Sequence, residues 1–140
     1  MNDLESAHRW IVKAGNDFLN IRNNLSAAEV PWDTVCFHAQ QSAEKLLKAL
    51  LVLNGTTPPR THDLVAVLAQ CVEFEPSLRD LETDCRRLTY YAVGSRYPED
   101  LYEPTEEDGL AMFEAAQRVH AVVMNTVLGR AASQHDVEGA

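Results

Sequence analysis

One stretch of the sequence carries regularly spaced polar side chains that could hold a polar ligand. They recur at intervals of three and four residues: His38, Gln41, Lys45 and Lys48. This spacing places them on one stripe of a helix. Imidazole, amide and ammonium groups on a common stripe can donate hydrogen bonds to a phosphate or a carboxylate. A solvated helix face shows the same pattern, and residue chemistry alone favours the solvated face over a binding surface.

A second candidate is the segment Ser95-Arg96-Tyr97-Pro98. An arginine beside a tyrosine and a proline in a stiff turn offers a forked donor for phosphate or carboxylate. The structural alternative is that Arg96 pairs with Glu44 or with an acid between residues 99 and 108, while Tyr97 packs at the end of the fold. Residue chemistry favours this structural role.

His62 and Asp63 form a third candidate, because a carboxylate can orient an imidazole for proton transfer. Neither Ser nor Cys lies nearby in the sequence to complete a nucleophilic site. A position in the first turn of a helix explains Asp63 equally well. The histidines are scattered and no two are spaced four apart, so the sequence predicts no metal site and no cofactor.

The three cysteines, Cys36, Cys71 and Cys85, are odd in number and lack C-x-x-C spacing. They therefore indicate neither a disulfide framework nor a zinc site. Each lies on an apolar helical face, where a reduced cysteine behaves as a small hydrophobic side chain. We expect three buried thiols.

Length and charge limit the class of protein. The chain has 140 residues and a formal charge of −9, so we expect one domain over residues 1–128 and a flexible tail over 129–140. The negative charge argues against a general nucleic-acid or membrane binder. The apolar runs are far shorter than the roughly 20 residues that span a bilayer. The N-terminus resembles no secretory signal, so we expect a cytoplasmic protein.

Apolar residues three and four apart predict helices throughout the chain. The expected helices run from about residue 4 to 24, from 32 to 54, through residues 64–72 after a cap at Thr61, through 78–92 after Pro76, and from 106 to 128 after a cap at Thr105. We expect Leu110 to be buried in the last of them. Without a sheet to cover, these helices must pack on one another. The sequence predicts an all-α, up-and-down antiparallel bundle of four to five helices.

Three segments in this order strongly resemble the HEPN domain family. The first is FHAQQSAEKLLKALL over residues 37–51, the second is RTHDL over 60–64, and the third is SRYP over 95–98. The resemblance extends over about residues 5 to 128. It implies a compact bundle of four or five helices that usually dimerises.

The resemblance also implies two kinds of function. Many bacterial members are encoded beside a minimal nucleotidyltransferase and form a toxin–antitoxin-like pair with it. Catalytic relatives are metal-independent RNases built on an arginine followed, after four to six residues, by a histidine. The present chain departs from that motif: no histidine lies five to seven residues after Arg86, Arg87 or Arg96. The one literal match, Arg130 with His135, lies in the expected tail.

We therefore expect a helical binding subunit that partners a nucleotidyltransferase encoded nearby and holds a nucleotide or that partner. Its ligand-binding residues would be Arg96, Tyr97, His38, Gln41, Lys45 and Lys48. One alternative is an RNase with an unorthodox active site, in which Arg96 acts with His38 or His62 on RNA. The other alternative is a homodimeric interaction module without a ligand.

Overall fold

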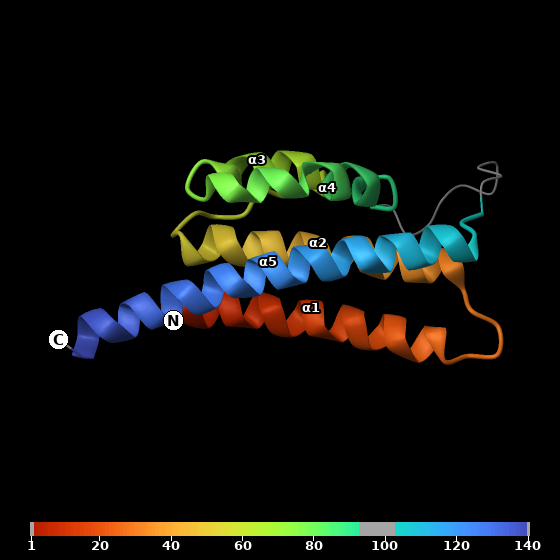
Figure 1. The fold of residues 1–140 in the computed structure, drawn as a ribbon, viewed down its shortest axis with the longest axis horizontal. Coiled ribbons are helices and arrows are strands. Elements are labelled where there is room, and N and C mark those ends of the chain that lie inside the picture. Colours follow the sequence, from red (N-terminus) through yellow and green to blue (C-terminus); the bar gives the residue numbers. More distant parts are fainter. Residues whose placement is uncertain (1, 93–102, 140) are drawn as a thin grey trace.

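Helices account for most of the described chain. The computed structural model describes residues 2–92 and 103–139, with side chains placed as far as residue 133. Within these ranges the secondary structure is entirely helical: α1 (Asp3–Leu25), α2 (Trp32–Leu53), α3 (Leu64–Val72), the 3₁₀ helix η1 (Pro76–Leu81), α4 (Glu82–Thr89) and α5 (Glu106–Gly139). The predicted all-α bundle is confirmed (Figure 1).

The helices lie in layers around α2. Helix α1 packs along one side of α2, α5 lies beside both, and α3 with α4 cover the other side (Figure 1). Helices α2, α3 and α5 run in one direction, whereas α1 and α4 run in the other (Figure 1). Helix α3 is parallel to α2 because residues 54–63 lead the chain back along α2 before the next helix begins, which places His62 within hydrogen-bonding distance of Gln40 and Glu44.

The end of α2 follows the predicted signal. The helix stops at Leu53 with Asn54 as its C-terminal cap. Gly55 then adopts a φ of 76°, a left-handed conformation that side chains with a Cβ rarely adopt. The two prolines that follow prevent any continuation of the helix.

The caps of the later helices confirm one prediction and correct another. At α5, Thr105 Oγ1 accepts a hydrogen bond from Asp108 N at 3.1 Å, and Asp108 Oδ2 accepts one from Thr105 N at 2.9 Å. This reciprocal pair is a capping box. At α3, however, the cap is Asp63 rather than Thr61, because Asp63 Oδ1 accepts from Val65 N at 3.0 Å. Thr61 lies two residues too early to reach the first turn of α3.

Helix α2 supplies most of the core. Its buried residues occur on nearly all sides, as expected of a helix surrounded by others. The three cysteines are fully buried, as predicted. Burial raises the pKa of each thiol from its ordinary value of 9.0 to about 12.

Three details of the later helices differ from the sequence-based expectation. Helix α5 continues past residue 128 to Gly139, because residues 129–139 contain no proline to end it. Whether these residues form a flexible tail stays a prediction. Leu110 is 40% exposed, and Met112 and Ala115 are buried instead, since α5 is rotated relative to the assumed stripe. The segment after Pro76 first forms η1, and α4 ends at Thr89 rather than near residue 92.

Candidate functional site

A buried carboxylate on α1 organises the first part of the candidate site. Asp17 is 5% exposed. Its Oδ2 accepts a hydrogen bond from Lys45 Nζ at 2.6 Å, and its Oδ1 accepts one from His38 Nδ1 at 2.8 Å. Both partners come from α2 and are only partly exposed. We call these three residues the Asp17 cluster, and it fixes the polar stripe of α2 against α1.

A second buried carboxylate lies on α2 itself. Glu44 is 6% exposed. Its Oε2 accepts from Lys48 Nζ at 3.1 Å, and its Oε1 accepts from His62 Nδ1 at 2.8 Å and from Gln40 Nε2 at 3.2 Å. We call these four residues the Glu44 cluster. It ties α2 to the loop that precedes α3.

The two clusters lie on neighbouring turns of α2, and Gln41 of the polar stripe connects to the Glu44 cluster. Gln41 Nε2 donates to Gln40 Oε1 at 2.7 Å, and Gln40 Nε2 also donates to the backbone oxygen of His62 at 3.2 Å. Every buried side-chain nitrogen and oxygen in the described residues has a hydrogen-bond partner. A buried polar network satisfied in this way holds its members in one arrangement.

The electrostatics of the site differ from those of a simple cationic stripe. Each lysine of the stripe is paired with a carboxylate, so Asp17 compensates Lys45 and Glu44 compensates Lys48. Lys48 is 6% exposed. The interpretation of the stripe as a solvated face is therefore wrong for Lys48. His38, Gln41 and Lys45 are half-buried and form the accessible part of the stripe.

The remaining predicted site residues differ in whether the structure describes them and where it places them. Arg96 and Tyr97 lie outside the described residues, so their place beside the stripe stays a prediction. His62 is brought to the site, and its side chain is 64% exposed although its Nδ1 contacts the buried Glu44. Asp63 serves as a helix cap.

Sequence reasoning missed Asp17 and Gln40 and gave Glu44 only as a possible partner of Arg96. A signal for Asp17 exists, because this acid lies on the inward stripe of α1 between Ala14 and Ile21, both of which are buried. Gln40 and Glu44 are polar residues four apart in a helix that is otherwise apolar on that side. Their mutual hydrogen bond could be expected, but their contacts with His62 could not.

The arrangement positions two imidazoles for proton transfer or hydrogen bonding. An ionised carboxylate can only accept, so Nδ1 of His38 and Nδ1 of His62 carry the hydrogen, and Nε2 of each ring is the acceptor when the ring is neutral. A carboxylate that orients an imidazole in this way is a recurring element of acid–base sites. The described residues contain no group of three or more His, Cys, Asp or Glu side chains that could hold a metal ion.

Within the described residues, no helix combines the length and the hydrophobicity that a bilayer span requires. Comparisons with curated proteins and with solved structures found no match. A family model described as HEPN domain matches residues 7–126.

Proposed function

This chain belongs to the HEPN domain family, and from that premise we propose that it is the helical binding subunit of a two-component system. Its partner is a minimal nucleotidyltransferase encoded nearby, and the accessible stripe of α2 holds a nucleotide or that partner. The pairing with a nucleotidyltransferase comes from the family resemblance. The residues proposed for binding come from the geometry of the site.

The Asp17 cluster is the observation that supports a binding role. Asp17 uses one hydrogen of Lys45 and the Nδ1 edge of His38, which leaves two ammonium hydrogens and Nε2 for another molecule. Gln41 donates to Gln40 through its amide nitrogen and keeps an oxygen as an acceptor. These groups are held in place before a ligand arrives, which lowers the entropic cost of binding.

Co-expression with the neighbouring reading frame tests the partnership. We expect a stable complex, and we expect His38→Ala and Lys45→Ala to weaken it. Arg86→Ala is the matched control, because Arg86 is an exposed cation whose ion pair is with Glu82 on its own helix α4. Two proteins that elute separately would contradict the partnership. Equal weakening by all three variants would contradict the role of the stripe.

A thermal shift with ATP or GTP tests the nucleotide. A ligand at 100 times its dissociation constant stabilises the folded state by about 2.7 kcal/mol. We expect this shift in the wild type and in Arg86→Ala, and its loss in Lys45→Ala. If the complex with the partner forms without any shift, the stripe binds the partner alone. If neither occurs, a homodimeric module without a ligand is the better description.

A second candidate function rests on His62. Its side chain is 64% exposed and its Nδ1 contacts the buried Glu44, which leaves Nε2 for the role of a general base. In an unorthodox RNase, this imidazole would take the proton of the ribose 2′-hydroxyl and Arg96 would bind the phosphate. Incubation of purified protein with RNA tests this role. Cleavage abolished by His62→Ala and Arg96→Ala supports it, whereas cleavage unaffected by both changes indicates a contaminant.

A further inference from the structure

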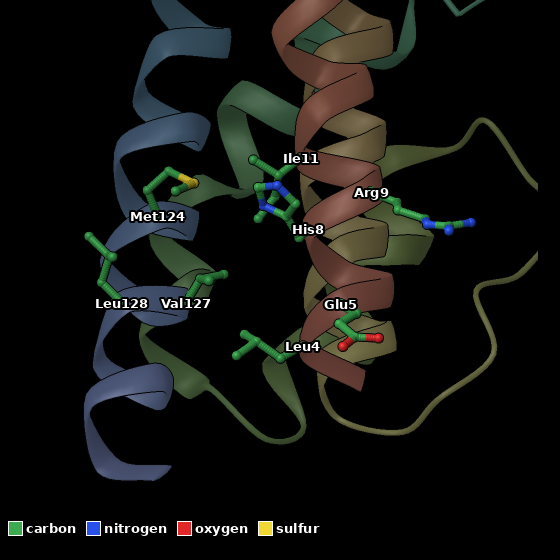
Figure 2. Close-up of a pocket in the computed structure, with 8 residues that line it drawn as sticks. All are labelled: Leu4, Glu5, His8, Arg9, Ile11, Met124, Val127 and Leu128. Atoms are coloured by element: carbon green, nitrogen blue, oxygen red, sulfur yellow. The ribbon is translucent and has the colours of Figure 1, made fainter. Parts of the chain in front are cut away.

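A groove stays open between α1 and α5. Its cavity has a volume of about 650 Å³ and is lined mainly by aliphatic side chains. Leu4 and Ile11 of α1, with Met124 and Val127 of α5, point into the gap from its two sides (Figure 2). Clefts of about 300–1,000 Å³ with a largely apolar lining are typical of small-molecule sites. The size and the lining of this groove therefore suit the apolar body of a small molecule.

The groove exists because the side chains at this end of the two helices are too short to fill the gap. About two turns farther along α1, the ring of Phe18 lies 6.3 Å from that of Phe113 and 5.4 Å from that of His120, measured between centroids. These rings bridge α1 and α5 at that level. No Phe, Tyr or Trp belongs to the cavity lining around Leu4 and Ile11, so the gap stays open there.

The groove also contains a polar side chain without a partner. The imidazole of His8 lies in the gap between α1 and α5 (Figure 2), and it forms no hydrogen bond or ion pair within the described part of the chain. Arg9 lines the groove as well, and its side chain extends away from the gap, past the edge of α1 (Figure 2). An imidazole N–H and a guanidinium can both donate to one anionic group at the mouth of the groove.

The charge around the groove favours an anion, although the whole chain carries a formal charge of −9. Between residues 6 and 25 the one acid is Asp17, which is buried and already paired with a lysine. Residues 117–133 of α5 contain no acid. The acidic side chains of the protein are therefore concentrated away from this part of the surface, and a negatively charged molecule meets less repulsion here.

A second hollow extends the mouth of the groove along α1. It has a volume of about 380 Å³, shares His8 and Arg9 with the groove, and adds the exposed Lys13. Glu5 is the one acid in the lining of the groove. This carboxylate repels a doubly charged head group more strongly than a singly charged one. A carboxylate therefore suits the mouth better than a phosphate monoester does.

We propose that the groove binds a free carboxylic acid with an unbranched apolar chain. The chain lies among the aliphatic side chains, and the carboxylate accepts hydrogen bonds from His8 and Arg9 at the mouth. Leu4 and Ile11 are about 10 Å apart along α1, from the rise of 1.5 Å per residue, so the groove suits a chain of medium length such as that of decanoate. This site goes beyond the proposed function, because it uses none of the residues of the α2 stripe.

Calorimetric titration of the full chain with hexanoate, octanoate and decanoate tests the apolar part of the site. Each step adds two methylene groups, and each buried methylene contributes about 0.8 kcal/mol, so the dissociation constant should fall about 15-fold per step. A dissociation constant that does not depend on chain length would overturn the proposal. Light scattering on the same samples measures the mass. A chain that is dimeric and binds no decanoate would also overturn it and leave the groove to a second copy.

A comparison of decanoate with decanol tests the head group. Arg9→Gln removes a charge-assisted hydrogen bond at an exposed position, so we expect it to weaken decanoate binding about fivefold and to leave decanol binding unchanged. Arg87→Gln is the matched control, because it removes the same charge from an exposed position on α4. Glu5→Gln should strengthen decanoate binding. Equal effects of Arg9→Gln and Arg87→Gln on decanoate would overturn the role of the carboxylate.

A variant inside the groove separates the chain from the head group. Met124→Gln keeps the length of the side chain but makes it polar, so we expect weaker binding of decanoate and of decanol alike. Circular dichroism checks that each variant is folded. The wild type is also mixed with phosphatidylglycerol vesicles. Binding to these vesicles without binding to free decanoate would overturn the proposal and indicate a lipid surface instead.

Discussion

The two buried carboxylates of this protein have similar partners but different surroundings. Asp17 and Glu44 each accept hydrogen bonds from one lysine and one histidine. Around Asp17, both partners are partly exposed, at 22% for His38 and 25% for Lys45. Around Glu44, the exposure is divided unequally, because the side chain of Lys48 is 8% exposed whereas the side chain of His62 is 64% exposed.

This difference shows that the composition of a charged cluster does not determine its energetic role. Loss of Asp17 would leave the ammonium of Lys45 and the imidazole of His38, and water can reach both. Loss of Glu44 would leave Lys48 charged inside the core, without a partner. Removing one member of a buried ion pair is strongly destabilising, whereas an exposed pair contributes little. We therefore expect the Glu44 cluster to contribute more to stability than the Asp17 cluster does.

The largest effect is expected for Glu44→Ala. We expect a loss of about 3–5 kcal/mol in the free energy of unfolding, because the ammonium of Lys48 stays buried without its carboxylate. Urea denaturation measures this change. The double variant Glu44→Leu with Lys48→Met should recover most of the loss. If Glu44→Ala lost less free energy of unfolding than Asp17→Ala, the Asp17 cluster would be the one that contributes more to stability.

Asp17→Ala is expected to have an intermediate effect of about 1–3 kcal/mol. His38 and Lys45 can turn toward solvent once the carboxylate is gone, so part of their hydration is regained. The same urea denaturation series measures this loss in the free energy of unfolding. Asp17→Asn is the matched control, because it keeps the shape of the side chain and one acceptor. If Asp17→Ala cost as much as Glu44→Ala, solvent access would not be the distinguishing factor.

The thiols extend the comparison to uncharged groups that water does not reach. Burial raises the pKa of Cys71 from 9.0 to about 12, so the folded state keeps a proton that the unfolded state loses above pH 9. Stability is therefore fully retained below about pH 9 and falls as the pH rises toward about 12. At about pH 10 the loss is about 1.4 kcal/mol per thiol. Between about pH 8 and pH 10, the free energy of unfolding should fall less in Cys71→Ala than in the wild type. Equal losses in the two proteins would refute the raised pKa of the Cys71 thiol.

The smallest effect is expected for His62→Ala, at about 0–1 kcal/mol. Its ring is mostly exposed, so the contact with Glu44 Oε1 is largely exchanged for water. His38→Ala should cost more, because that ring is mostly covered. Denaturation of the two variants side by side measures the difference. A larger loss for His62→Ala would mean that the loop before α3 depends on this contact.

Local patterns predicted much of the fold. The apolar spacing in α1, α2 and α5 indicated the helices, and Asn54-Gly55 and Thr105 marked boundaries that the structure confirms. The position of the α3 cap was missed, because Thr61 and Asp63 offer similar side chains and only the backbone path decides which one reaches the first turn. The exposure of Leu110 was missed for a related reason, since a stripe shows which residues share a face but not the angle at which that face meets its neighbours.

The sequence by itself determined the helices, the buried thiols and the polar stripe of α2, because all of these depend on intervals of three and four residues within one segment. Only the tertiary structure decided what the stripe became. Asp17 lies 21 residues from His38, and His62 lies 18 residues from Glu44. Their placement depends on how α1 and the loop before α3 pack against α2. Whether a lysine is solvated or buried with a carboxylate is decided by that packing, since water access is a property of the assembled fold and not of any single helix.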